Sequence, residues 1–123
     1  NGNQSYKHIT NKVILENAAR DMKILFDIHS PNQTDFDVYV KVLRPDNNTT
    51  DDKIGWIKLD NFDKKNTSNI KSHYISYDLS LTKNCSVWND TTEYIAYRVK
   101  LVGKSSNSCR PVLFKNLRAI AIT

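Results

Sequence analysis

The sequence predicts an all-β fold: an antiparallel β-sandwich or jelly roll of about seven to eight strands, with very little helix. Apolar and polar residues alternate with period two over most of the chain, as they do in strands with one buried face. Polar segments rich in Asn, Ser, Asp and Pro separate the alternating runs, and a single short stretch favours a helix. With 123 residues, of which 39% are hydrophobic, the chain can bury one core. We therefore expect one sandwich domain over residues 1–123, excised from or attached to a larger chain.

Long alternating runs predict four strands, and shorter patterns predict three more. In each long run we expect one residue at the centre of the buried face: Phe26, Val40, Tyr77 and Val99. The long runs are 22–28, 36–42, 73–81 and 95–101, and the shorter strands are 9–15, 56–59 and 118–122. Residues 16–21 are the one helical candidate, and polar loops are expected at 44–55, 60–69, 83–90 and 103–111.

No motif of the sequence predicts catalysis. Each of the three histidines, His8, His29 and His73, lies in a strand pattern without a second His or Cys at ligand spacing. There is no Gly-rich phosphate loop, nucleophile elbow or zinc-protease motif. The acidic segment 46–52 lacks the calcium-loop pattern and is expected to be a solvated loop, with calcium binding as the lesser alternative. We therefore expect a protein that is not an enzyme, with no catalytic residue, metal or cofactor.

The net charge is +5, but the basic residues are spread along the sequence. Nucleic-acid binders usually cluster their charge in one stripe or tail, so no nucleic-acid partner is expected. No apolar run approaches the roughly 20 residues that a membrane-spanning helix needs, so no membrane span is expected either.

Two features leave the compartment open. The cysteines, Cys85 and Cys109, permit one disulfide or two free thiols. Seven Asn-x-Ser/Thr sequons occur, which suits a secreted glycoprotein but also follows from turn segments rich in Asn, Ser and Thr. The sequons begin at Asn3, Asn32, Asn47, Asn48, Asn66, Asn84 and Asn89.

Aromatic residues outside the buried faces predict a binding surface. The alternation places Tyr39, Tyr74 and Tyr94 on solvent-side strand faces, with Lys41 and Arg98 expected at the rim of their patch. Trp88 lies in a polar loop beside Cys85, where an exposed ring could stack on a sugar. These six residues are the predicted binding residues: Tyr39, Tyr74, Tyr94, Trp88, Lys41 and Arg98.

Two segments carry a resemblance to known proteins. One is Thr34-Asp35-Phe36-Asp37-Val38-Tyr39-Val40-Lys41-Val42-Leu43 with the later Trp56-Ile57-Lys58-Leu59. The other is Tyr97-Arg98-Val99-Lys100-Leu101-Val102-Gly103 with Lys115-Asn116-Leu117-Arg118-Ala119-Ile120-Ala121. In this order they resemble a β-rich module in tail and baseplate proteins of T4-like marine phages, over nearly the whole chain. The layout is also similar, more loosely, to galactose-binding-like jelly rolls.

The phage resemblance implies a non-enzymatic structural or interaction module of a virion, assembled in the host cytoplasm. Its partners would be other virion chains, in a homo- or hetero-oligomer, because unpaired sheet edges invite pairing with another chain. The jelly-roll resemblance implies the alternative, a carbohydrate-binding module for a host glycan or a secreted lectin-like domain.

Overall fold

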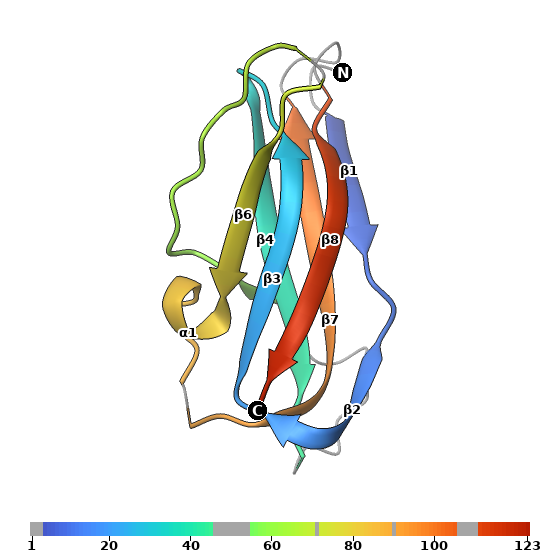
Figure 1. The fold of residues 1–123 in the computed structure, drawn as a ribbon, viewed down its shortest axis with the longest axis vertical. Coiled ribbons are helices and arrows are strands. Elements are labelled where there is room, and N and C mark those ends of the chain that lie inside the picture. The colour runs from blue at the N-terminus through green and yellow to red at the C-terminus, as the bar shows by residue number, and fades with distance from the viewer. Residues whose placement is uncertain (1–3, 46–54, 71, 90, 106–110) are drawn as a thin grey trace.

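The computed structural model describes residues 4–45, 55–70, 72–89, 91–105 and 111–123. Their strands form two antiparallel sheets packed face to face, which confirms the predicted all-β sandwich (Figure 1). The strands are β1 (Gln4–Ile9), β2 (Val13–Ala19), β3 (Asp21–His29), β4 (Thr34–Leu43), β5 (Ile57–Lys58), β6 (Ile75–Ser80), β7 (Tyr94–Ser105) and β8 (Leu113–Ile122). A single helical turn, α1 (Leu81–Asn84), lies beside them.

The five-stranded sheet is built around β7, the longest strand. One side of β7 pairs with β4, which in turn pairs with β5. The other side pairs with β1 along its C-terminal part and with β2 near its N-terminus. Thr10 joins these two pairings, because its backbone N–H donates to the carbonyl of Val99 and its hydroxyl accepts from the Val99 N–H, both at 2.9 Å.

The three-stranded sheet has the order β6-β3-β8 and covers the inner face of the larger one. Its core residues come from β3, where Met22, Ile24, Phe26 and Ile28 are fully buried. Across the interface, Phe36 on β4 meets Phe26 edge-on, with ring centroids 5.9 Å apart. The period-two pattern is therefore read correctly in both sheets.

The expected burial of the four central residues holds, fully for three and partly for one. Phe26, Val40 and Val99 have no exposed surface. Tyr77 is partly buried: its ring stacks on Phe26 at 5.3 Å, while its hydroxyl accepts from the backbone N–H of Lys65.

Three sequence-based assignments of local structure are wrong. Residues 16–21 are not helical, because 16–19 belong to β2, whose backbone finds partners on β7. The single strand expected at 9–15 is two strands, separated at 10–12. The one helical turn lies at 81–84 instead, where the Ser80 side chain caps it by accepting from the Lys83 N–H.

The two sides of the sandwich are closed differently. On the side of β5 and β6, two elements complete the core. The segment that follows β5 adds Leu59 and Phe62, and α1 adds Leu81. On the other side β1 and β8 lie along the two sheet edges, and among the described strands neither has a second neighbour there (Figure 1). No helix of the described residues is long and apolar enough to cross a membrane.

Candidate interaction surfaces

The outer face of the five-stranded sheet gathers basic and aromatic side chains. Opposed residues of antiparallel strands share a face, and the register places Tyr39 opposite Lys100 and Lys58, and Lys41 opposite Arg98. Lys64 reaches the same face from the segment after β5, where it pairs with Asp35 and Asp37. We call this surface the basic–aromatic face; its charged and aromatic members are Lys7, Lys41, Lys58, Lys64, Arg98, Lys100, Lys104, Asp35, Asp37, Tyr39 and Trp56.

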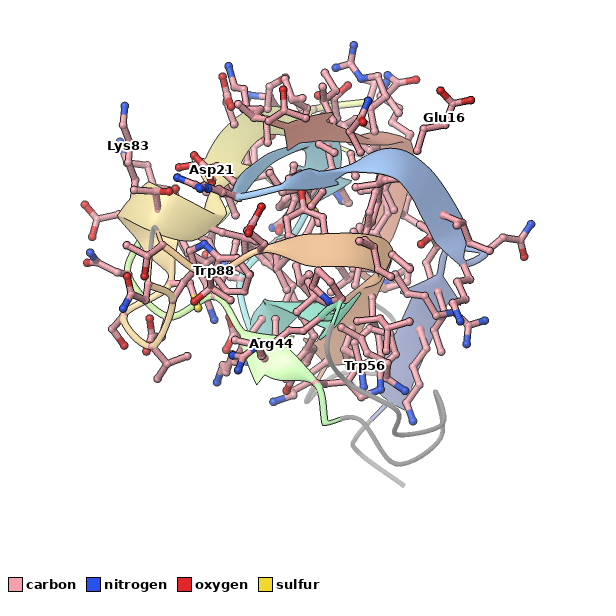
Figure 2. The ribbon with its side chains drawn as sticks, turned by 90° about the horizontal axis from the view of Figure 1, so that it is seen from below. Glu16, Asp21, Arg44, Trp56, Lys83 and Trp88 are labelled. Atoms are coloured by element: carbon pink, nitrogen blue, oxygen red, sulfur yellow. The ribbon has the colours of Figure 1, made fainter. Side chains whose placement is uncertain are left out.

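Two aromatic rings support the ammonium groups in one half of this face. The Lys100 Nζ lies 4.6 Å from the ring centroid of Tyr39 and 4.5 Å from that of Trp56. The Lys41 Nζ lies 4.8 Å from the same Trp56 ring, and its side chain is almost fully buried. Figure 2 shows Trp56 on this side of the molecule, away from Trp88. Such contacts hold each ammonium in one place by cation–π attraction.

One carboxylate organises the other half of the face. Asp37 is 1% exposed, and three ammonium groups surround it: Lys104 at 2.7 Å, Lys64 at 3.1 Å and Lys58 at 3.4 Å. Burial alone would raise the pKa of Asp37, but hydrogen bonds and charges from Lys104 and Lys64 outweigh it and lower the pKa to about 2. Asp37 is thus ionised at any physiological pH, and it raises the pKa of Lys104 in return.

The cations of the first half repel one another. Burial lowers the pKa of Lys100, and the positive charges of Lys7 and Lys41 lower it further. No carboxylate among the described residues forms an ion pair with Lys100. The described part of the chain therefore provides no carboxylate that neutralises the charge of Lys100.

The structure brings together three of the six predicted binding residues. Tyr39, Lys41 and Arg98 share the basic–aromatic face. Tyr74 does not join them, since it lies just before β6 on the other sheet, with its ring 5.9 Å from that of His29 and the Lys115 Nζ 4.0 Å above it. The single tyrosine patch expected from the alternation is therefore wrong.

Tyr94 and Trp88 are buried, so their expected exposure is also wrong. Tyr94 begins β7, where β2 curls under the end of the sandwich and places Ala19 opposite it. Its hydroxyl donates to the carbonyl of Asp21 at 2.6 Å, and burial raises its pKa. The Trp88 ring is 9% exposed, and its Nε1–H donates to the carbonyl of Arg20 at 2.9 Å. Both side chains thus hold the turn between β2 and β3 through its backbone carbonyls.

Eight of the eleven members of this face were not predicted as binding residues from the sequence, among them Trp56, Lys100 and Asp37. Lys100 and Asp37 stand at polar positions of correctly predicted strands, so the sequence predicts that both face outward. Their proximity depends on which strands pair, and β4 pairs with β7 across more than fifty intervening residues. The period-two pattern carries no information about that partner.

A second surface lies along the open side between β1 and β8. Seven large apolar residues are exposed among the described residues, and five of them lie on β1, β2 and β8. The five are Ile9, Val13, Ile14, Ile120 and Ile122, with Ile14 75% and Ile120 53% exposed. A hollow of about 280 Å³ opens between the two edges, lined by His8 from β1 and by residues 114–117 of β8.

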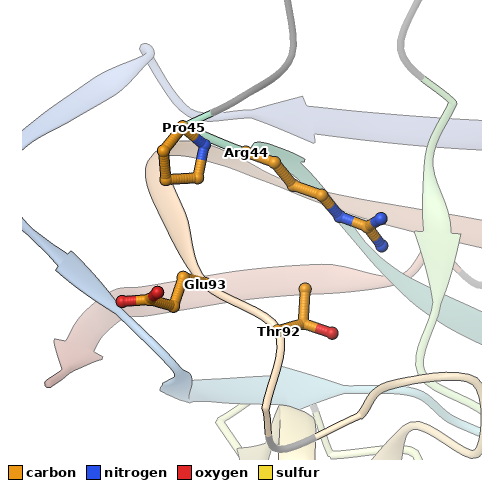
Figure 3. A pocket seen from close by; sticks show the side chains of 4 residues that line it. All are labelled: Arg44, Pro45, Thr92 and Glu93. Carbon is orange, nitrogen blue, oxygen red and sulfur yellow. The ribbon is translucent and has the colours of Figure 1, made fainter.

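A hollow of about 390 Å³ at the end of the sandwich is a weaker candidate. It is lined by Arg44 and Pro45 after β4 and by Thr92 and Glu93 before β7. Figure 3 shows that the side chains of Arg44 and Glu93 point away from each other, so the two charges do not converge on one ligand position. No aromatic side chain is among these four residues, which leaves no ring for a sugar to stack on.

The three histidines form no metal-binding cluster with other described residues. The His29 ring lies 2.9 Å from the carbonyl oxygen of His73, and the His73 ring contacts Ser68. His8 is on β1, at the open side. Within the described ranges no three His, Cys, Asp or Glu residues are close enough to hold a metal ion.

The described sequons differ in how freely a glycan could be attached. The Asn66 side-chain amide donates to the carbonyls of Ser30, Pro31 and Thr34, and Asn84 donates to the carbonyl of Asn61. A glycan on either would replace these bonds. Asn32 and Asn89 are exposed, whereas Asn3, Asn47 and Asn48 lie outside the described residues.

The cysteines give no evidence for a disulfide. Cys85 is a buried free thiol, and its burial raises its pKa. Cys109 and the acidic segment 46–52 lie outside the described residues.

Comparison with known proteins found no match: no family model, no curated protein and no solved structure is significantly similar to this chain.

Proposed function

We propose that this chain is a non-enzymatic interaction module of a tailed-phage virion, a component of the tail or baseplate. The observation that carries the interaction role is the concentration of exposed apolar side chains on β1, β2 and β8, beside sheet edges without a described neighbour. Exposed apolar groups beside an unpaired edge are typical of surfaces that another chain covers. The virion placement is supported by the sequence resemblance alone.

The contact would combine backbone pairing with side-chain burial. β8 has ten residues, and its outer edge can accept a strand of a neighbouring chain. Ile120 and Ile122 lie on the outer face of the same strand, and Ile9 and Ile14 lie on the strands across the open side. A stable contact of this kind buries on the order of 1,200 Å² or more in total.

Paired substitutions test the contact. Ile14→Lys and Ile120→Lys place charge on the open side, whereas Ile70→Lys and Val87→Lys place the same charge at residues that are 65% and 73% exposed elsewhere. We expect light scattering of the concentrated chain to show an oligomer that the first pair dissociates and the second leaves intact. A wild-type chain that stays monomeric, or equal effects of both pairs, would contradict association through this side in a homo-oligomer.

The virion placement has a separate test. Mass spectrometry of purified particles from a phage that encodes this chain should detect its peptides in every preparation. Particles that lack them would refute the placement, whatever the outcome for the open side.

Carbohydrate binding is the second candidate function, and a different surface favours it. The expected stacking ring, Trp88, is buried and bonded, which removes the loop site. Tyr39 and Trp56 are partly exposed on the basic–aromatic face, so this face is the remaining candidate site for a sugar.

A further inference from the structure

The chain concentrates its positive charge on one face. Among the described residues the basic–aromatic face carries seven basic and two acidic side chains. The outer face of the three-stranded sheet is balanced, with Lys23, Lys115 and Arg118 against Asp21, Asp27 and Asp78. A one-sided excess of this kind attracts anions from solution.

The cations are spread over four strands. Lys7 lies on β1, Lys100 on β7, Lys41 on β4 and Lys58 on β5, and neighbouring strands are about 4.8 Å apart. A single phosphate or carboxylate reaches one or two of them. A polymer that repeats its negative charge can follow the whole row across the sheet.

The half around Tyr39 and Trp56 is the part best prepared for an anion. Its ammonium groups are already held over the rings, so an anion that pairs with Lys100 immobilises less side-chain freedom. The Lys7 and Lys100 charges also repel each other, and a negative group placed between them relieves that repulsion.

We propose that the basic–aromatic face binds an acidic polysaccharide, with its carboxylates paired to Lys7 and Lys100. Six of the seven cations are lysines, and lysine is depleted at protein–protein interfaces, which disfavours an acidic protein surface. Nucleic-acid readers favour the planar arginine fork and bare aromatic rings for base stacking. Here the ring faces already carry ammonium groups.

Titration calorimetry with polygalacturonate tests the proposal. We expect binding by the wild-type chain and about tenfold or greater loss of affinity in Lys7→Gln/Lys100→Gln. The matched control, Lys83→Gln/Lys115→Gln, removes two exposed lysines on α1 and on β8 of the other sheet and should bind like the wild type. Thermal unfolding of all variants confirms that they are folded.

Several outcomes overturn the proposal: no binding of polygalacturonate, equal losses in the two double variants, or equal binding of neutral dextran. Tighter binding of single-stranded oligothymidylate identifies a nucleic-acid surface instead, and tighter binding of polyglutamate identifies a protein partner. The Ile120→Lys variant, whose new charge lies on the outer face of the three-stranded sheet, should bind polygalacturonate normally. The proposal can therefore fail or succeed independently of association through the open side.

Discussion

The outer face of each sheet holds a central carboxylate, but the two carboxylates are stabilised by different kinds of group. Asp37 on the larger sheet is buried beneath three ammonium groups. Asp27 on the smaller sheet accepts hydrogen bonds from Ser76 at 2.6 Å and Asn116 at 2.8 Å, and these neutral donors lower its pKa.

The difference separates a face whose charges pair with one another from a face that gathers more basic than acidic side chains. Around Asp27 the polar groups satisfy one another, and Lys23 pairs with Asp78 at 3.2 Å. Around Asp37 the lysines that bury the carboxylate are only part of the local positive charge, because Lys7, Lys41 and Lys100 lie beside them. A face that serves stability alone gains nothing from this excess.

The largest effect is expected when the two carboxylates are neutralised in turn. Asp37→Asn leaves three lysines facing a neutral, buried amide, so the free energy of unfolding should fall by roughly 2–3 kcal/mol. Asp27→Asn keeps one of the two oxygens that accept from Ser76 and Asn116, so one of these bonds is lost and the change should cost about 1 kcal/mol. Urea unfolding measures the loss of stability in both variants. Equal losses would show that the charge of Asp37 is not needed to stabilise the three lysines around it.

The same carboxylate predicts how stability depends on acid. The pKa of Asp37 falls from 3.8 to about 2 on folding, so its contribution is complete above about pH 4 and is lost as the pH falls through 2. Asp37→Asn should therefore lose less stability than the wild type between pH 4 and 2. Identical slopes for the two chains over this range would contradict the lowered pKa.

A smaller difference in stability is expected between variants of Tyr39 and Tyr94, which the sequence predicts on solvent-side strand faces alike. Tyr94→Phe removes the bond from a buried hydroxyl to the Asp21 carbonyl and should cost about 1 kcal/mol. Tyr39→Phe changes a partly exposed ring on the basic–aromatic face and should cost much less. Equal melting temperatures for the two variants would speak against the buried position of Tyr94.

The sequence predicted the layers of the fold because alternation is a local property. Phe26, Val40 and Val99 are buried as expected, and Lys41 and Arg98 face outward together. Alternation fails at the end of the sandwich, where Tyr94 has the parity of the outer face but is buried against Trp88 and Tyr97. Trp88 is likewise buried by a distant segment, the turn at Arg20, which its own polar neighbours do not reveal.

The basic–aromatic face was half predictable for the same reason. Each lysine stands at an outward position, but lysines that are spread along the sequence become neighbours once β1, β7, β4 and β5 pair. Even spacing in the sequence predicts no charge clustering, and this prediction is wrong because strand pairing brings the lysines onto one face. The expected lack of a nucleic-acid partner, which rested on it, stays a prediction.

The smallest expected effect is a change in the free energy of unfolding that has opposite signs for a lysine of each outer face. Lys7→Gln removes a positive charge that repels Lys100, so it should raise the free energy of unfolding by about 0.3 kcal/mol. Lys23→Gln removes the partner of Asp78 and should lower it by a similar amount. Both changes should shrink at 1 M salt, where the Debye length is about 3 Å. Chemical unfolding at 20 mM and 1 M NaCl measures the pair, with Lys83→Gln as the control for loss of an exposed lysine. If Lys7→Gln destabilises the chain as Lys23→Gln does, the charges of the basic–aromatic face are already balanced, and the excess that would attract an acidic polymer does not exist.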